Sequence, residues 1–131
     1  MSICYCDTLR LAARKMTARY DAALEPVGLS IAQFALLRKI RRAGQPSLTE
    51  LGRLAGLDRS TMGRNVRVLE KAGLAALSRG KDQREATVQL TDKGGEILAL
   101  AEPLWTRAQG EIDDLLGPEG AAGLRRLAET V

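Results

Sequence analysis

Apolar residues recur three and four positions apart over most of the chain, which is the spacing of a helix with one buried face. Residues 3–24 show this spacing. The Glu25-Pro26 pair then ends the predicted helix, because the residue before a proline is pushed out of the helical region. The sequence Ser30-Ile31-Ala32-Gln33 has the form of a capping box and predicts a second helix that ends near Gly44.

A third amphipathic stretch begins after the capping residue Thr91 and continues to about Leu116. Pro103 lies inside it and predicts a kink, since proline lacks a backbone N–H. Gly117 ends this helix, and Pro118 suits the first position of a last one. The first, long and last helices carry more apolar surface than a domain of 131 residues can cover, which favours pairing of two copies through them.

Residues 47–73 predict two short helices joined by a tight turn. Ser47-Leu48-Thr49-Glu50 is a second capping box, in which we expect the Glu50 carboxylate to reach back to the N–H of the first residue. Gly56 can end the first helix in the left-handed conformation, and Asp58 can cap the second, which stops at Gly73. This is the pattern of a helix-turn-helix.

A β-hairpin follows the two short helices. Leu74–Leu77 and Ala86–Leu90 are strand-like runs, and the charged segment Ser78–Glu85 joins them. Aromatic residues make up only 3% of the chain, and strand-forming residues are scarce elsewhere. We therefore predict a mostly α protein with a small β-hairpin wing, a winged helix-turn-helix with flanking dimerisation helices.

The second short helix and the loop carry side chains that suit DNA. Arginine can bond bidentately to guanine, asparagine to adenine, and hydroxyls to bases or phosphates. An aspartate two residues before an arginine can brace it by an ion pair. The alternative is a solvated helix face, since exposed arginine and serine are common on helices. The candidate DNA-binding residues are Arg59, Ser60, Thr61, Arg64, Asn65 and Arg67 on the helix and Arg79, Lys81, Asp82 and Arg84 on the hairpin.

The charge distribution favours DNA over the solvated face. Residues 59–84 contain seven Lys or Arg and two Asp or Glu, a net charge of +5 in a chain whose total is +4. Residues 1–46 also carry +5, whereas residues 91–131 carry −4. A concentrated positive field is typical of nucleic-acid-binding proteins. The acidic C-terminal part could orient the protein on a polyanion or could simply be a solvated helix face.

Two segments resemble the MarR (multiple-antibiotic-resistance regulator) family of bacterial transcription factors. The first is LDRSTMGRNVRVLEKAGL at residues 57–74, and the second is KDQREATVQLTDKG at residues 81–94. A helix, an Asp-x-Arg wing and a Leu-Thr-x-x-Gly sequence together are a fairly specific combination. The residues at that family's positions are Asp82, Arg84, Leu90, Thr91 and Gly94.

The resemblance implies how such a protein would work. It implies a homodimer on double-stranded DNA, with a recognition helix in each major groove and Arg84 entering a minor groove. We expect a cytoplasmic protein on separate grounds, because charged residues interrupt the N-terminal apolar run that a signal peptide would need. The operator would be pseudo-palindromic, with half-sites ~34 Å apart. It also implies a repressor released by a small aromatic or phenolic effector. The expected divisions are residues 1–29 for N-terminal dimerisation, 30–90 for DNA binding and 91–131 for C-terminal dimerisation, within one structural unit.

Cys4 and Cys6 leave two interpretations open. Both can be small packing residues at the start of a helix. Alternatively they form a redox switch, since a thiol near a helix N-terminus oxidises more readily. Organic-hydroperoxide-sensing MarR-family members carry a reactive cysteine in their first helix, although the Cys-x-Cys spacing differs from their pattern.

Other function classes have less support in the sequence. The chain has no histidine, no glycine-rich phosphate loop and no metal-binding cluster, so we expect neither an enzyme nor a cofactor. No apolar run approaches the ~20 residues of a membrane helix. A winged-helix module for protein contacts is the remaining alternative. Salt dependence of DNA affinity would separate it from a DNA-binding protein.

Overall fold

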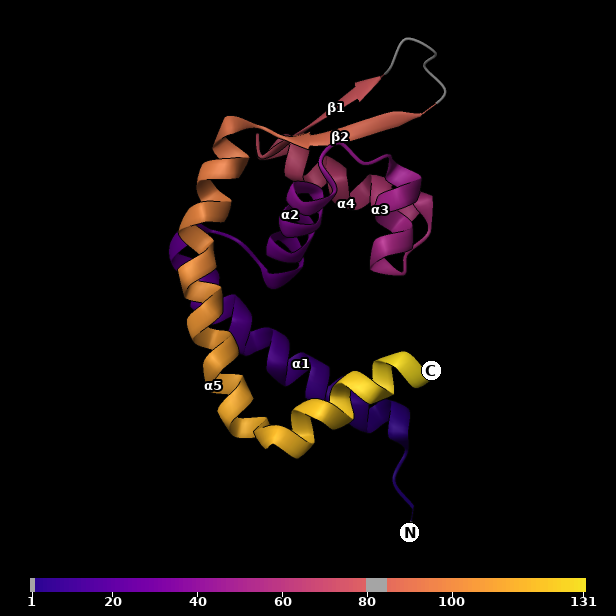
Figure 1. The fold of residues 1–131 in the computed structure, drawn as a ribbon, viewed down its shortest axis with the longest axis vertical. Helices are drawn as coiled ribbons and strands as arrows, with labels where there is room; N and C mark the ends of the chain where they lie inside the picture. The colour runs from indigo at the N-terminus through magenta and orange to yellow at the C-terminus, as the bar shows by residue number, and fades with distance from the viewer. Residues whose placement is uncertain (1, 80–84) are drawn as a thin grey trace.

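The computed structural model describes residues 2–79 and 85–131. It is mostly helical, with a two-stranded antiparallel hairpin beside a group of three short helices (Figure 1). The predicted fold class is confirmed. The elements are α1 (Tyr5–Leu24), the 3-10 turn η1 (Glu25–Val27), α2 (Ile31–Ala43), α3 (Leu48–Ala55), α4 (Arg59–Lys71), β1 (Ala75–Arg79), β2 (Ala86–Leu90) and α5 (Asp92–Thr130).

The core lies where α2, α3, α4 and the hairpin meet. Apolar residues from each of these elements are almost wholly removed from solvent, with exposed fractions of at most 1%. Burial of such side chains stabilises the fold by ~1.5–3 kcal/mol each. The helix-turn-helix is therefore held by its own core. Its most buried members include Phe34, Leu37, Leu51, Val66 and Val88.

α5 leaves this group of helices and runs down one side of the molecule, and α1 crosses beside its lower half (Figure 1). Its helical dihedral angles break at Gly117, where φ is 70° and ψ is 170°. The final segment then turns back beside α1. The stop expected at Gly117 is confirmed. Pro103 keeps helical dihedral angles, so the helix is not broken there, and the kink expected at Pro103 stays a prediction.

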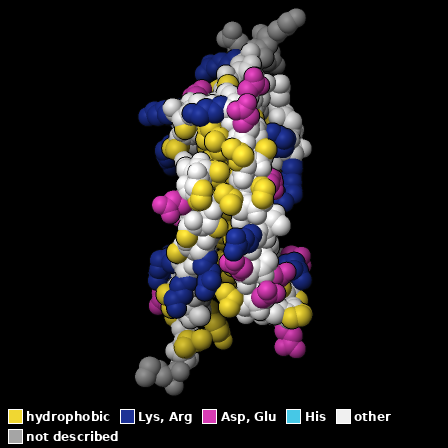
Figure 2. Space-filling model, turned by 90° about the vertical axis from the view of Figure 1, so that its left-hand side faces the viewer, with side chains coloured by type: hydrophobic (Ala, Val, Ile, Leu, Met, Phe, Trp, Pro, Cys, Tyr) yellow, Lys and Arg dark blue, Asp and Glu magenta, His cyan; other side chains and the backbone are white. Residues whose placement is uncertain are grey.

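The outer face of α5 carries a vertical band of hydrophobic side chains with charged side chains around it (Figure 2). Leu100 and Leu115 are both more than 60% exposed. None of the helices within residues 2–79 and 85–131 is long and apolar enough to cross a membrane.

The hairpin is anchored to the segment before α3. β1 and β2 pair antiparallel, with Leu77 opposite Val88. The Val88 N–H donates to the carbonyl of Pro46 at 2.8 Å, and Ser47 forms an isolated bridge with Thr87. β1 continues to Arg79, two residues beyond the prediction, because cross-strand pairing holds residues that the sequence alone placed in a loop.

α5 packs closely against the start of the hairpin. The Thr91 hydroxyl accepts from the Gly94 N–H at 3.0 Å and donates to the Gly73 carbonyl at 2.6 Å. The Thr91 N–H donates to the Leu74 carbonyl at 3.1 Å. A Cβ built on Gly94 would lie 1.9 Å from that Leu74 oxygen. The approach of α5 to β1 therefore requires glycine at position 94.

A side chain of α1 caps α2. The Asp21 carboxylate accepts from the backbone N–H of Ile31, the first residue of α2, at 2.7 Å. At the same helix end, Ser30 and Gln33 form both hydrogen bonds of the predicted capping box. Three side chains therefore satisfy the amino end of α2, one of them from the preceding helix.

Candidate nucleic-acid interface

The exposed face of α4 presents hydroxyl and guanidinium groups. Ser60, Arg64 and Arg67 follow one another at spacings of four and three, so they share one side of the helix, and all three are exposed. The opposite side, with Met62, Val66 and Leu69, is buried. The remaining predicted residues, Arg59, Thr61 and Asn65, lie at the edges of the exposed face.

A local network orders the beginning of α4. The Asp58 carboxylate accepts from the Thr61 N–H at 2.7 Å and from the Thr61 hydroxyl at 3.1 Å. These hydrogen bonds lower the pKa of Asp58 below its ordinary value. The Arg64 guanidinium donates to the Thr61 hydroxyl at 3.3 Å. Thr61 thus orients Arg64 as well as capping the helix.

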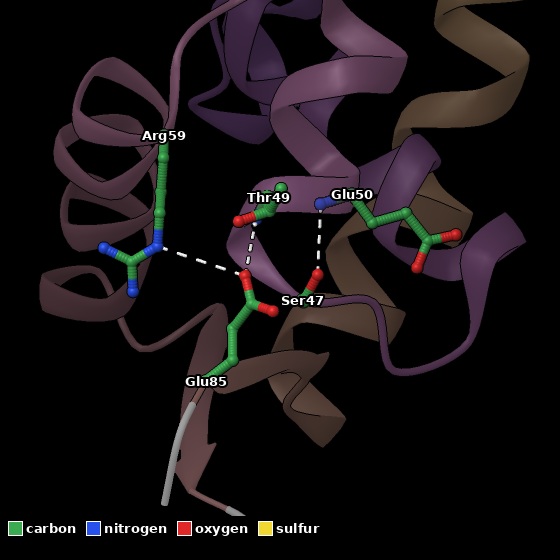
Figure 3. Close-up of polar contacts among 5 residues, drawn as sticks. All are labelled: Ser47, Thr49, Glu50, Arg59 and Glu85. Carbon is green, nitrogen blue, oxygen red and sulfur yellow. Dashed lines mark hydrogen bonds and ion pairs between the residues drawn. The ribbon is translucent and has the colours of Figure 1, made fainter.

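Glu85 connects the hairpin to the amino ends of α3 and α4 (Figure 3). Its Oε1 accepts from the Thr49 N–H at 3.2 Å and lies 4.0 Å from Nε of Arg59. The hydrogen bonds from Thr49 hold the pKa of the Glu85 carboxyl below its ordinary value, and the charge of Arg59 lowers it further. Sequence analysis missed this role. The available signal was an acidic residue next to a strand in an otherwise basic stretch.

The predicted capping box at Ser47 is only half formed. The Ser47 hydroxyl accepts from the Glu50 N–H at 3.0 Å, but the Glu50 carboxylate points away from Ser47 (Figure 3). The expectation that Glu50 reaches back is therefore wrong. Glu85 supplies a second acceptor at this helix end instead, because the Thr49 N–H lies within its reach.

The hairpin contributes Arg79, which is exposed at the end of β1. The other predicted hairpin residues, Lys81, Asp82 and Arg84, lie outside the described residues. The expected ion pair between Asp82 and Arg84 stays a prediction for the same reason.

A cavity of about 380 Å³ lies between α2 and the inner edge of α4. Its lining is mainly apolar, with the cation of Lys39 from α2 and the amide of Asn65 from α4. The predicted base-reading residue Asn65 therefore borders a space inside the protein surface as well as the exposed face of its helix. The apolar lining includes Leu36, Leu57, Met62, Val68 and Leu69.

Three of the four aromatic residues, Tyr20, Phe34 and Trp105, contact side chains of a neighbouring helix. Phe34 is buried and stacks on Trp105 of α5, with ring centroids 5.7 Å apart. The Arg38 guanidinium lies 4.2 Å from the Trp105 ring, and a smaller cavity of about 180 Å³ opens beside these three residues. The Tyr20 hydroxyl donates to the Gln109 side chain, and burial together with Asp113 raises its pKa.

Cys4 and Cys6 are exposed and free. Cys4 is the residue before α1, where its side chain makes no capping hydrogen bond. Its carbonyl accepts from the Thr8 N–H at 3.0 Å and the Thr8 hydroxyl at 2.9 Å. The backbone at this helix end is therefore ordered, and both thiols face solvent.

A helix-turn-helix followed by a hairpin against its first helix defines a winged helix-turn-helix protein. The MarR family model matches residues 29–85. The transcriptional regulator MosR of M. tuberculosis, in a complex with DNA, is 35% identical. The alignment covers 97% of this chain and 95% of MosR, with a TM-score of 0.87. The chain belongs to the MarR family of transcriptional regulators.

Further similarities agree with this family. A second MosR structure, not described as a DNA complex, is 33% identical over 98% of this chain and 97% of MosR, with a TM-score of 0.78. The repressor CouR, bound to a DNA duplex, is 27% identical over 97% and 91% of the two chains, with a TM-score of 0.83. An uncharacterized HTH-type transcriptional regulator of Bacillus subtilis (strain 168), YhbI, is 26% identical over 93% of this chain and 80% of its own length.

Proposed function

We propose that this protein is a sequence-specific DNA-binding regulator whose α4 enters the major groove. The observation that carries the proposal is the exposed side of α4, where Ser60, Arg64 and Arg67 project next to a capped and ordered helix start. Such residues at the beginning of a second helix meet base edges in helix-turn-helix proteins. The greater similarity to MosR bound to DNA than to the other MosR structure supports a DNA-competent conformation.

Binding to duplex DNA by fluorescence anisotropy tests this function. We expect Arg64→Ala to cost about 1–3 kcal/mol on a specific duplex and less on a random one, if the side chain reads a base. Arg107→Ala is a matched control, because Arg107 is an exposed arginine far along α5 whose pair with Glu111 is solvated. Affinity that is indifferent to salt would instead favour the protein-interaction module.

The proposed assembly is a homodimer that contacts a pseudo-palindromic operator. Large apolar side chains on α1 and α5 are exposed in the single chain, including Tyr5 at 84% and Leu115 at 64%. Contact with a second copy of the chain would remove this apolar surface from water. We expect Leu115→Glu to shift the protein toward monomer in sedimentation velocity. An unchanged sedimentation coefficient would place the interface elsewhere.

The proposed mode of control is repression that a small aromatic or phenolic effector relieves. The 380 Å³ cavity borders α2 and α4, so a ligand there would contact the helix proposed to meet DNA. Its volume is within the range of small-molecule sites, and Lys39 suits an acidic group on the ligand. An effector relieves repression only if it binds better to the form with displaced recognition helices.

Fluorescence of Trp105, the single tryptophan, can distinguish the two cavities. Trp105 lines the smaller cavity and not the larger one. A compound such as 4-hydroxybenzoate that releases DNA and quenches Trp105 directly would occupy the smaller site. Release of DNA without such quenching would favour the cavity beside α4.

Redox control through Cys4 and Cys6 is a second candidate. It is favoured by their exposure and by their free thiols two residues apart at the start of α1. Oxidation by an organic hydroperoxide would give a sulfenic acid, which a second thiol would convert to a disulfide with loss of water. DNA affinity measured before and after mild oxidation, then after reductant, tests this. The switch would be supported if oxidation lowers DNA affinity, reductant restores it, and Cys4→Ser prevents the change.

A further inference from the structure

Glu85 lies where two positive features converge. Its carboxylate meets the amino end of α3, which is the positive end of the helix dipole, and the guanidinium of Arg59, the first residue of α4. One oxygen, Oε1, serves both Thr49 and Arg59. The side chains remain partly solvated, with exposed fractions of 37% for Glu85 and 58% for Arg59. This is an anchoring contact at the surface.

The position of Glu85 along the hairpin determines which part of the hairpin this contact holds against the helices. The backbone link between β2 and the segment before α3 is made by Val88, which donates to Pro46. Thr87 forms the neighbouring bridge to Ser47. Three residues of this part of the hairpin, 85, 87 and 88, contact α3 or the segment before it. Of these, Glu85 lies farthest along the chain from α5. Without it, the outer half of the hairpin would be tied to the helices only through β1 and β2 themselves.

We infer that Glu85 is a positioning residue for DNA recognition, which fixes the base of the wing and the Arg59 side chain in one arrangement with α3 and α4. The inference rests on the proposed DNA binding and deepens it. Glu85 contributes no attraction to DNA of its own. Its contribution is the geometry of its neighbours, because a surface that is already ordered loses less conformational entropy on binding.

The opposite expectation follows from charge alone. A carboxylate beside a phosphate backbone repels it, and the amino end of α3 with a free arginine would form a ready phosphate site. If Glu85 acts only through its charge, removing it should raise affinity for every duplex. The positioning role predicts the opposite sign for a specific duplex, so the two interpretations are separable.

The test compares Glu85→Ala, Glu85→Gln and a matched acidic control, Glu50→Ala. Glu50 lies at the same helix end, and its carboxylate points away from this contact (Figure 3). Each variant is titrated against a duplex selected by the unmodified protein from a random library, and against a random duplex of equal length. Circular dichroism and urea unfolding of each variant show whether it is folded.

Loss of one charge-assisted hydrogen bond predicts that Glu85→Ala binds the selected duplex roughly tenfold more weakly. The random duplex should change less, since loosened geometry reduces discrimination more than phosphate attraction. Glu85→Gln can still accept from Thr49, so it should lose less than about threefold. Glu50→Ala should bind no more weakly than the unmodified protein.

Coupling to Arg59 completes the test. If Glu85 orients Arg59, then Arg59→Ala should cost less in the Glu85→Ala background than alone. Equal or tighter binding by Glu85→Ala, or strictly additive effects with Arg59→Ala, overturns the inference while the DNA-binding proposal stands. Failure of the unmodified protein to select any duplex overturns both.

Discussion

Replacing Gly94 with alanine should destabilise the protein, although alanine usually stabilises a helix. Gly94 is in the first turn of α5, where its N–H donates to the Thr91 hydroxyl. The added Cβ would lie 1.9 Å from the Leu74 oxygen, whereas ordinary contacts begin at 3.4 Å. The backbone must separate by roughly 1.5 Å to restore a normal contact. The Leu74 oxygen is a backbone atom, so no side-chain rotation can relieve the clash.

The energetic terms can be estimated from these contacts. Overpacking of this kind costs about 1–3 kcal/mol. The Thr91 N–H to Leu74 hydrogen bond, at 3.1 Å, would be lost with the separation and contributes about 1 kcal/mol. The helix preference of alanine over glycine returns at most about 1 kcal/mol. The net change in the free energy of unfolding is therefore a loss of about 1–3 kcal/mol.

Urea unfolding followed by circular dichroism measures this change, at one protein concentration because an oligomer would make stability concentration-dependent. Gly95→Ala is the matched control. Its Cβ would meet only the end of the Arg41 side chain, at 3.0 Å, which can move. We expect Gly95→Ala to be neutral or stabilising. A Gly94→Ala protein as stable as the Gly95→Ala protein would refute the close-packing argument.

Three further predictions concern helix ends, acid and proline. Ser30→Ala should destabilise the protein by about 1 kcal/mol. The loss should be greater than for Ser47→Ala, because the helix after Ser47 keeps the Glu85 carboxylate as an acceptor. Equal losses of unfolding free energy in urea would contradict this. Hydrogen bonds to the ionised form lower the pKa of Glu85, so its stabilisation is present above the ordinary value of 4.5 and is lost as pH falls through the folded value. Glu85→Gln should therefore lose less stability than the unmodified protein between pH 6 and pH 3 in urea titrations, and an equal loss would argue against the contact. Pro103→Ala should raise the thermal midpoint, since it restores a backbone donor inside α5. A lowered midpoint would mean that the packing contacts of the proline ring stabilise the protein more than the added hydrogen bond does.

The elements were predictable because their ends carry local signals. The residues that cap α2, α3, α4 and α5 are the ones that the sequence indicated, and Gly56 and Gly117 adopt positive φ where helices were expected to end. These signals act through hydrogen bonds within three or four residues. They therefore survive in any tertiary context that permits the helix.

The errors arose where distant residues decide the outcome. Glu50 was assigned a local hydrogen bond, but the acceptor at this helix end is Glu85, 36 residues away from the Thr49 N–H that donates to it. β1 extends to Arg79 because Ala86 pairs with it across the hairpin. Such pairings join residues that are far apart in the chain, so the periodicity of a short sequence window does not reveal them.

The candidate site likewise has features that the sequence predicts and features that depend on distant residues. The residue types on α4 and their common face follow from helical spacing, so Ser60, Arg64 and Arg67 could be grouped in advance. The tether from Arg64 to Thr61 and the contact between Glu85 and Arg59 depend on side-chain rotamers and on the docking of the hairpin. Spacing along the chain does not determine either of them.

The hydrogen bond from Asp21 to the start of α2 has a consequence for variation among related chains. It joins α1 to α2 directly, across the turn that contains Glu25–Val27. The angle between the two helices is thus set at the joint itself. Substitutions at the exposed positions Glu25 and Pro26 should be tolerated as long as an acceptor remains at position 21, whereas Val27 and Leu29 pack in the core. The two exposed positions are therefore natural places to label the chain without displacing the helix-turn-helix.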